Sequence, residues 1–196
     1  TLTVPWDPHS TSAGSFELYA REIYADGNED KPAIVYLQGG PGFPAPRPFG
    51  GAGKVAGSEI GGVVGKALEE FRFILLDQRG TGRSHRIDSA SPAEDLSVER
   101  LSKLQQSYIV DDAEALRKAL GIEKWSLFGQ SFGGFCITSY LSRYPESIEH
   151  AYLPGGLPAT SVGIDDVYRS TFEKVRARHH ACLLYTSPSP RDRTRS

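Results

Sequence analysis

The chain has 196 residues, of which 39% are hydrophobic and 23% charged, enough for one sizeable core. A formal net charge of −2 provides no basic field that would attract nucleic acid or an anionic membrane surface. Two cysteines, Cys136 and Cys182, exclude a disulfide framework, and no apolar run reaches the roughly 20 residues of a membrane span. We therefore expect a protein with no nucleic-acid or membrane partner.

The start of the chain bears on where the protein works. Its first ten residues show no charged segment followed by an apolar run, so no export signal is visible and we expect a cytoplasmic protein. Methionine is absent everywhere, including position 1. We therefore expect the natural start, and any leader that it carries, to lie outside this sequence.

The N-terminal third predicts strands. Residues 16–24 alternate apolar and polar side chains, as a half-exposed strand does, and the turn at 27–30 predicts a hairpin partner directly afterwards. Two nearly continuous apolar runs, 33–37 and 73–76, are typical of parallel strands covered on both faces. Between them we expect a Gly/Pro-rich loop at 39–53.

The following elements alternate between helix and strand. From 98 to 120 apolar residues recur at helical spacing, and Gly121 is placed to end that helix. The other elements that we expect are a helix near 58–70, a strand at 125–128, a helix at 132–144 and a strand at 148–153. This alternation predicts an α/β fold, with a mostly parallel sheet and helices on both faces.

The pattern changes near residue 160, so we expect three parts: a core at 1–160, the start of a helical cap at 161–181 and a tail at 182–196. Residues 165–181 predict one polar amphipathic helix. The tail has no apolar period, which predicts disorder. Its sequence resembles translated linker DNA, so we interpret it as non-native; the alternative is an ordinary flexible tail.

The strongest chemical signal is the string Gly129-Gln130-Ser131-Phe132-Gly133. A Gly-x-Ser-x-Gly string marks a nucleophile elbow only when a strand precedes it and a helix follows, and both flanks fit here. Without that context the string would indicate only a turn. We therefore predict that Ser131 is a nucleophile, with the amino terminus of the next helix directed at the site.

A second loop follows the first apolar strand, with the sequence Gln38, Gly39, Gly40, Pro41 and Gly42. Glycines allow a substrate oxygen to approach the backbone closely, which an acyl-transfer enzyme needs for its oxyanion hole. Such loops are often turns only, but two matched loops at the ends of strands favour a site. We assign the oxyanion hole to the N–H groups of Gly40 and Phe132.

A third motif, residues 77–84, follows the next apolar strand. A nucleotide site would need a glycine-rich loop that opens directly into a helix, together with a lysine or a later acidic residue, and that context is absent. We interpret the motif as a structural turn, in which Asp77 and Arg79 hold neighbouring loops through charge-assisted hydrogen bonds.

At these three places the sequence resembles the proline iminopeptidases of the α/β-hydrolase superfamily, which combine an HGGPG loop, a DQRGxGxS turn and a GxSxGG elbow. The resemblance covers roughly residues 33 to 160, with Gln38 in place of the usual histidine. It implies an α/β-hydrolase fold and a serine exopeptidase that removes an N-terminal residue, often proline, without metal or cofactor. Ser131 is the implied nucleophile, and Gly40 and Phe132 the implied oxyanion donors.

The resemblance also implies an acid and a base beyond the cap, so we expect this chain to lack both. His150, His179 and His180 are interpreted as solvated. Asp165 and Asp166 are weaker candidates for the acid, because helix capping explains the pair equally well.

Several ionisable residues outside the motifs receive structural interpretations. Asp111, Asp112 and Glu114 are read as the wet face of the crossover helix, and Cys136 as core packing without an activated thiolate. Any carboxylates that bind a substrate's amino group are expected in a further part of the cap.

Two other functions stay open. One is an esterase or amide hydrolase on the same scaffold, since nothing before residue 160 recognises an amino group. The other is a non-catalytic fragment or interaction module, because an incomplete sheet exposes a strand edge. The expected partner is therefore a peptide or a small amide or ester substrate, and the oligomeric state is left unassigned.

Overall fold

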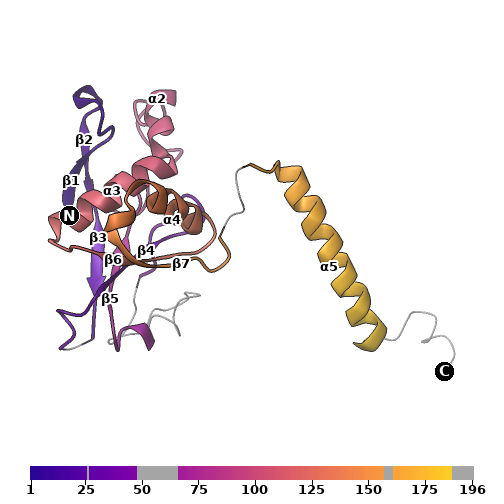
Figure 1. Ribbon diagram of the computed structural model, residues 1–196. Helices are drawn as coiled ribbons and strands as arrows, with labels where there is room; N and C mark the ends of the chain where they lie inside the picture. Colours follow the sequence, from indigo (N-terminus) through magenta and orange to yellow (C-terminus); the bar gives the residue numbers. More distant parts are fainter. Residues whose placement is uncertain (26, 48–65, 157–160, 187–196) are drawn as a thin grey trace. The chain divides into compact units, whose positions relative to one another are not determined.

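The computed structural model describes residues 1–25, 27–47, 66–156 and 161–186 (Figure 1). The chain divides into two compact units, Thr1–Leu157 and Pro158–Ser196. All three sequence motifs fall within the first unit.

The first unit is built on a five-stranded sheet with the order β3-β5-β4-β6-β7. Strand β4 pairs in parallel with β5 and with β6, and β6 pairs in parallel with β7, while β3 runs antiparallel to β5. The strands are β3 (Ala20–Ile23), β4 (Ala33–Leu37), β5 (Arg72–Leu76), β6 (Trp125–Gly129) and β7 (Ile148–Tyr152). The predicted mostly parallel sheet is confirmed.

The N-terminal hairpin prediction is wrong in its pairing. Residues 16–24 do not form one strand: β2 (Ser15–Leu18) pairs with β1 (Leu2–Pro5) in a separate two-stranded sheet. Strand β3 then joins β5, not the strand that follows it in sequence. The reason is burial, since all five residues of β4 are buried and suit a central position, whereas β3 is partly exposed and suits an edge.

The helices follow the predicted order with one break. The expected helix over 98–120 is interrupted by extended backbone at Gln105, with ψ 158°, and Gly121, with φ 66°, follows its end. It divides into α2 (Val98–Leu101), η2 (Ser102–Leu104) and α3 (Gln106–Ala119). The remaining helical segments of the first unit are η1 (Thr11–Ala13), α4 (Phe132–Arg143) and η3 (Pro145–Ser147). Most of the helix expected near 58–70 lies outside the described residues.

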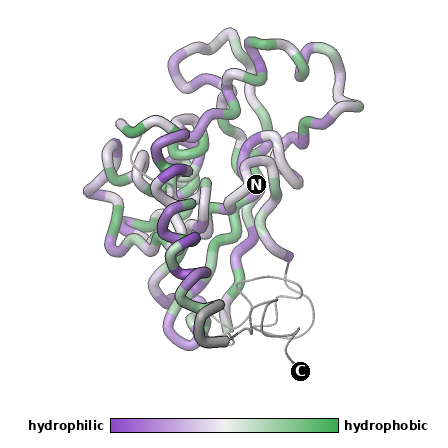
Figure 2. Tube along the Cα trace, turned by 90° about the vertical axis from the view of Figure 1, so that its right-hand side faces the viewer, coloured by the Kyte–Doolittle hydropathy of each residue, from purple (hydrophilic) through white to green (hydrophobic). Residues whose placement is uncertain are grey.

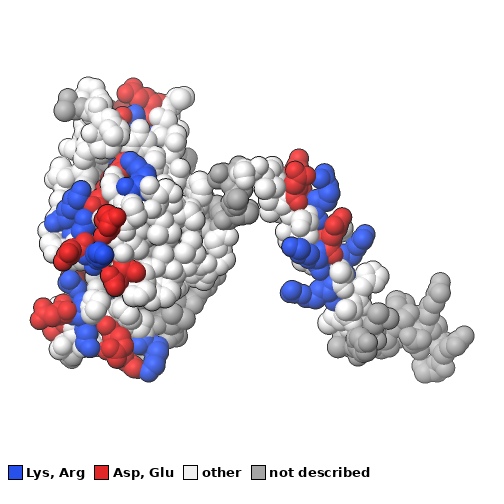
Figure 3. All heavy atoms as spheres, in the orientation of Figure 1, with Lys and Arg blue, Asp and Glu red and all other residues white. Residues whose placement is uncertain are grey.

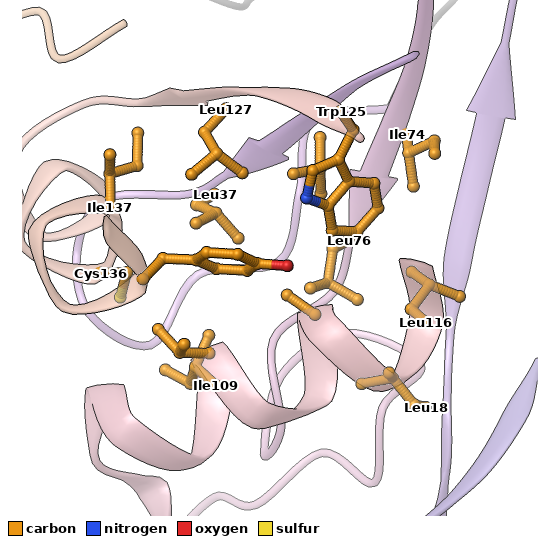
Figure 4. Packing of buried hydrophobic residues seen from close by; sticks show 14 of the residues in the cluster. Leu18, Leu37, Ile74, Leu76, Ile109, Leu116, Trp125, Leu127, Cys136 and Ile137 are labelled. Carbon is orange, nitrogen blue, oxygen red and sulfur yellow. The ribbon is translucent and has the colours of Figure 1, made fainter. Parts of the chain in front are cut away.

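Side chains of β4 alternate between two hydrophobic clusters. Val35 and Leu37 belong to the larger cluster, while Ile34 and Tyr36 belong to the smaller one, so both faces of the strand are covered. The larger cluster lies between the sheet and helices α3 and α4. Figure 4 shows side chains from its three components: Leu37, Leu76 and Leu127 from the strands, Cys136 and Ile137 from α4, and Ile109 and Leu116 from α3.

The sequence analysis interpreted Asp111, Asp112 and Glu114 as solvent-exposed residues of α3. This interpretation is wrong for Asp112 and Glu114, which are buried. Asp112 is 3% exposed, and Arg79 meets it with two hydrogen bonds, of 2.8 and 2.7 Å. Arg79 also donates to the carbonyls of Trp6 and Lys103, at 2.7 and 3.0 Å. The structural interpretation of Arg79 is thus confirmed. Burial raises the pKa of Asp112 to about 6, although the hydrogen bonds and the positive charge of Arg79 oppose the shift.

Glu114 is the second buried carboxylate of α3, with 4% exposure. It accepts hydrogen bonds from Arg117 on its own helix, at 2.6 and 2.9 Å, and from Tyr140 on α4, at 2.6 Å. Burial alone would raise the pKa of Glu114, but hydrogen bonds from Arg117, Tyr140 and Lys118 and the charge of Arg117 hold it at about 2. The carboxylate therefore links the two helices that cover one face of the sheet.

The second unit contains α5 (Ile164–Thr186). Hydrophobic positions recur along a mostly hydrophilic helix (Figure 2), and both signs of charge occur along it (Figure 3). The expected disorder from residue 182 onward is wrong for 182–186, because Ala, Cys and two leucines continue the helix before Pro188. Residues 187–196 lie outside the described part. Of the helices that are described, none combines the length and apolar character of a membrane span.

The Glu114 network predicts acid-sensitive stability. Because the folded-state pKa of about 2 lies below the ordinary 4.5, the stabilisation is complete above pH 4.5 and is lost as the pH falls towards 2. The contribution is on the order of 3 kcal/mol. Urea unfolding between pH 2 and 7, followed by circular dichroism, should show a shallower acid decline for Glu114→Gln, which should also be less stable at pH 7. Parallel pH curves for both proteins would contradict this.

The buried ion pair predicts a large cost for removing one partner. Asp112→Asn should lower the free energy of unfolding at pH 7 by about 3 kcal/mol or more, because the Arg79 charge stays buried without its counter-ion. Glu123→Gln, at an exposed site, is the matched control and should change it by less than about 0.5 kcal/mol. Chemical denaturation at pH 7 measures both, and equal effects would refute the assignment.

Candidate active site

Ser131 stands between the end of β6 and the first residue of α4. Its backbone has φ 53° and ψ −119°, a region that residues with a side chain rarely occupy. Two backbone hydrogen bonds close the turn: Gly133 N–H donates to Gln130 O and Gly134 N–H to Ser131 O, both at 2.9 Å. The strand, the turn and the helix occur as the sequence predicted, and Ser131 is partly exposed.

Helix α4 begins in close contact with strand β4. A Cβ atom added to Gly133 would lie 1.9 Å from the carbonyl oxygen of Leu37, so any side chain there would collide with backbone. This contact explains why the second glycine of the motif is required. It fixes the turn that carries Ser131 against the end of β4.

The loop at 38–42 lies against the Ser131 turn. Strand register sets this position, since Leu37 of β4 pairs with Gly129 of β6 and the two loops follow directly. A Cβ on Gly39 would come within 2.8 Å of Gln130 O and 3.3 Å of Ser131 Cβ. The structure thus brings together the two loops that the sequence identified separately.

Gln38, which replaces the histidine of the resembled motif, holds this loop in shape. Its side-chain oxygen accepts hydrogen bonds from the Tyr36 hydroxyl, at 2.7 Å, and from Gly39 N–H, at 2.9 Å. Its amide nitrogen donates to Pro44 O at 3.3 Å, and Gln78 donates to its backbone carbonyl at 2.9 Å. The Gln38 side chain thus connects the start of the loop, at Gly39, with its later part, at Pro44. The sequence motif alone did not predict these contacts.

The backbone N–H groups of Gly40 and Phe132 are among those at these loops that have no acceptor within the described ranges. Phe132 is the first residue of α4, where N–H groups have no partner inside the helix and the helix dipole is positive. Gly40 has φ 115°, a conformation that favours glycine. The other loop residues, Pro41 and Gly42, are exposed.

Asp77 ties the third motif to the same edge of the sheet. Its buried carboxylate accepts hydrogen bonds from the backbone N–H groups of Ala45 and Arg83, at 3.0 and 2.9 Å. The Arg47 guanidinium completes the set at 2.5 Å. Asp77 therefore joins the loop after β4 to the turn after β5, which confirms its structural interpretation.

Among the described residues of the first unit, no histidine has a hydrogen bond with Ser131. His150, His179 and His180 are exposed, and so are Asp165 and Asp166. The sequence analysis missed a further pair, His85 and Asp95, whose side chains are 2.9 Å apart. His85 packs edge-on against Trp6, the residue after β1, so this pair packs beside the N-terminal two-stranded sheet.

The described residues give no support for a cysteine nucleophile or for a metal site. Cys136 is fully buried in the core, and desolvation raises the pKa of its thiol to about 12, so the expected inert cysteine is confirmed. Within residues 1–25, 27–47, 66–156 and 161–186, no three His, Cys, Asp or Glu side chains gather as metal ligands would.

The α/β hydrolase fold family model matches residues 32–180. A proline iminopeptidase of Aeromonas sobria is 43% identical over 160 residues, covering 79% of this chain and 35% of that protein. One from Aspergillus aculeatus is 33% identical over 166 residues, covering 78% of this chain and 35% of that protein. A thermophilic esterase of Thermogutta terrifontis shares the fold, with TM-score 0.51 and 20% identity over 78% of this chain and 45% of that one.

The chain thus spans about a third of the length of the two proline iminopeptidases that it matches. The matched region includes all three motifs and the four parallel strands β4 to β7, whereas β3 precedes it. The chain belongs to the α/β-hydrolase fold family, and proline iminopeptidases are among its homologues.

Proposed function

We propose that the complete protein is a serine hydrolase that releases the N-terminal residue of peptides, preferably proline, through an acyl-enzyme on Ser131. The observation that carries the proposal is the position of Ser131, at a strained turn at the start of α4 and in contact with the glycine loop of β4. The names of the similar proteins support proline as the released residue.

In this mechanism Ser131 Oγ attacks the carbonyl carbon of the first peptide bond and loses its proton to a general base. The N–H groups of Gly40 and Phe132 are proposed to donate hydrogen bonds to the oxygen that becomes negative. The positive end of the α4 dipole favours the same charge. The shortened peptide leaves with a proton, and water then hydrolyses the ester on Ser131, which releases the free amino acid and returns the proton to the Ser131 oxygen.

The general base is proposed to be a histidine oriented by an aspartate, both supplied by parts of the complete protein outside the described residues. Support comes from His150, the histidine that follows Ser131 within the first unit: it lies on β7 and is exposed. We also propose that the carboxylates that would hold the substrate's amino group lie outside the described residues. A peptide with a free N-terminal proline is the proposed substrate.

Ser131→Ala in the complete protein should lower kcat by several orders of magnitude without unfolding it, because it removes only the attacking oxygen. Ser142→Ala is the matched control, since Ser142 lies on the exposed side of α4 and its hydroxyl donates only to Thr138 O, at 2.9 Å. Release of the aniline from a prolyl anilide measures both. Retained turnover in Ser131→Ala, or equal loss in Ser142→Ala, contradicts the assignment.

The requirement for a free amine separates an aminopeptidase from an esterase on this scaffold. A prolyl anilide with a free amine should be cleaved at least tenfold more efficiently than its N-acetylated form, because a buried carboxylate that pairs with the amine discriminates strongly. Comparing kcat/KM for both compounds and for a simple acyl ester provides the test. Equal cleavage of the blocked and free anilides, with faster ester hydrolysis, would favour the esterase.

A further inference from the structure

Three arginines gather around one tyrosine on the sheet edge that holds Ser131. The guanidinium carbons of Arg47 and Arg83 lie 5.5 and 5.0 Å from the centre of the Tyr19 ring. Arg21 and Arg83 each donate to the Tyr19 hydroxyl, at 3.4 Å. The aromatic face and the phenol oxygen thus hold three positive groups together, and we call these three residues the arginine cluster.

Within the described residues, two of the three positive charges of the cluster have no carboxylate partner. Arg47 is paired with Asp77 at 2.5 Å. Among the residues that the structure describes, Arg21 and Arg83 have no carboxylate partner, and Arg83 is exposed. The pKa of Tyr19 is correspondingly lowered, chiefly by the hydrogen bond from Arg21 and also by the charges of the three arginines, against a smaller opposing effect of burial.

Strand register places the cluster relative to Ser131. Ala20 of β3 pairs with Leu76 of β5, and Leu37 of β4 pairs with Gly129 of β6. Because β3 is antiparallel, Tyr19 leaves the sheet at the edge where Asp77, Gln38 and Gln130 leave it. Three inter-strand spacings of about 4.8 Å separate β3 from β6, so the two sites stand about 14 Å apart along one edge.

The segment between the two sites is fixed by contacts near both of its ends. The loop that begins beside Ser131 at Gly39 continues to Ala45 and Arg47, which both bind Asp77. Asp77 also receives the backbone N–H of Arg83. One buried carboxylate therefore fixes the position of two of the three arginines relative to the glycine loop.

We infer that the arginine cluster binds the C-terminal carboxylate of short peptide substrates on the leaving side of the scissile bond. Guanidinium groups recognise carboxylates through paired hydrogen bonds. An extended peptide advances about 3.3 Å per residue, so 14 Å corresponds to about four residues after the bond, and fewer once arginine side chains reach inward. The inference rests on the proposed function and adds a selection for peptides with two to four residues beyond the first.

The test uses the complete protein and a series of peptides Pro-(Ala)n, with n from 1 to 7, each with a free or an amidated C-terminus. For n of 2 to 4 the free acid should be cleaved about 5- to 10-fold more efficiently than the amide, mainly through a lower KM. This ratio should fall with added salt, since the cluster is accessible to ions. A prolyl anilide, which has no carboxylate, gives the activity that is independent of the cluster.

Arg83→Gln should bring the acid-to-amide ratio close to one and leave cleavage of the anilide unchanged. The substitution keeps the backbone N–H that Asp77 binds, so the turn itself is retained. Arg86→Gln, three residues away and paired with Asp88 at an exposed site, is the matched control and should keep the full ratio. Arg83→Lys should retain part of it.

Two results overturn the inference while the proposed function stands: cleavage of the anilide with an acid-to-amide ratio of one at every length, or an equal loss in Arg86→Gln. Amidated peptides with an internal aspartate distinguish an acidic side chain from the chain terminus. If the amidated aspartyl peptide matches the free acid, the terminal carboxylate is not the group selected. If wild type cleaves neither the anilide nor any peptide, both the proposed function and this inference are wrong.

Discussion

Helix α4 can start where it does only because Gly133 has no side chain. The space that a Cβ atom would need is filled by the carbonyl oxygen of Leu37, 1.9 Å from its ideal position. This close approach brings the amino terminus of the helix against the end of β4, so that the turn with Ser131 and the loop with Gly39 touch. The geometry proposed for catalysis depends on this single steric condition, since a longer separation would part the two loops.

Buried charge holds the surrounding loops in place. Arg79 joins α3 to the segment after β1 through Asp112 and the carbonyl of Trp6. Glu114 joins α3 to α4 through Tyr140. A guanidinium has five donors in a fixed plane, so it can satisfy a carboxylate and several carbonyls at once, which no apolar side chain could do. Such pairs add little net stability compared with apolar packing, but they specify which loops meet.

The residues with proposed roles lie at the ends of four neighbouring strands, along one edge of the sheet. Ser131 follows β6, Gly40 follows β4, Asp77 follows β5, and Tyr19 precedes β3. Parallel strands end at the same edge, and an antiparallel edge strand begins there, so four distant segments of sequence become neighbours. On the face drawn in Figure 3, few charged side chains cover α4 and β7, and charge is concentrated towards α3. The arginine cluster therefore stands at a place fixed by topology.

The sequence by itself determined the strands β4 to β7, the helix after Ser131 and the three loops with their motifs. The periodicity of apolar residues and the positions of glycines are local properties of a segment. They indicate its secondary structure whichever segments it packs against. Only the tertiary structure decided that β3 pairs with β5, that Asp112 and Glu114 are buried, and that Tyr19 meets three arginines. These outcomes depend on partners distant in sequence. A carboxylate on a helix is predicted to be solvent-exposed, because the sequence does not show that an arginine from another loop pairs with it.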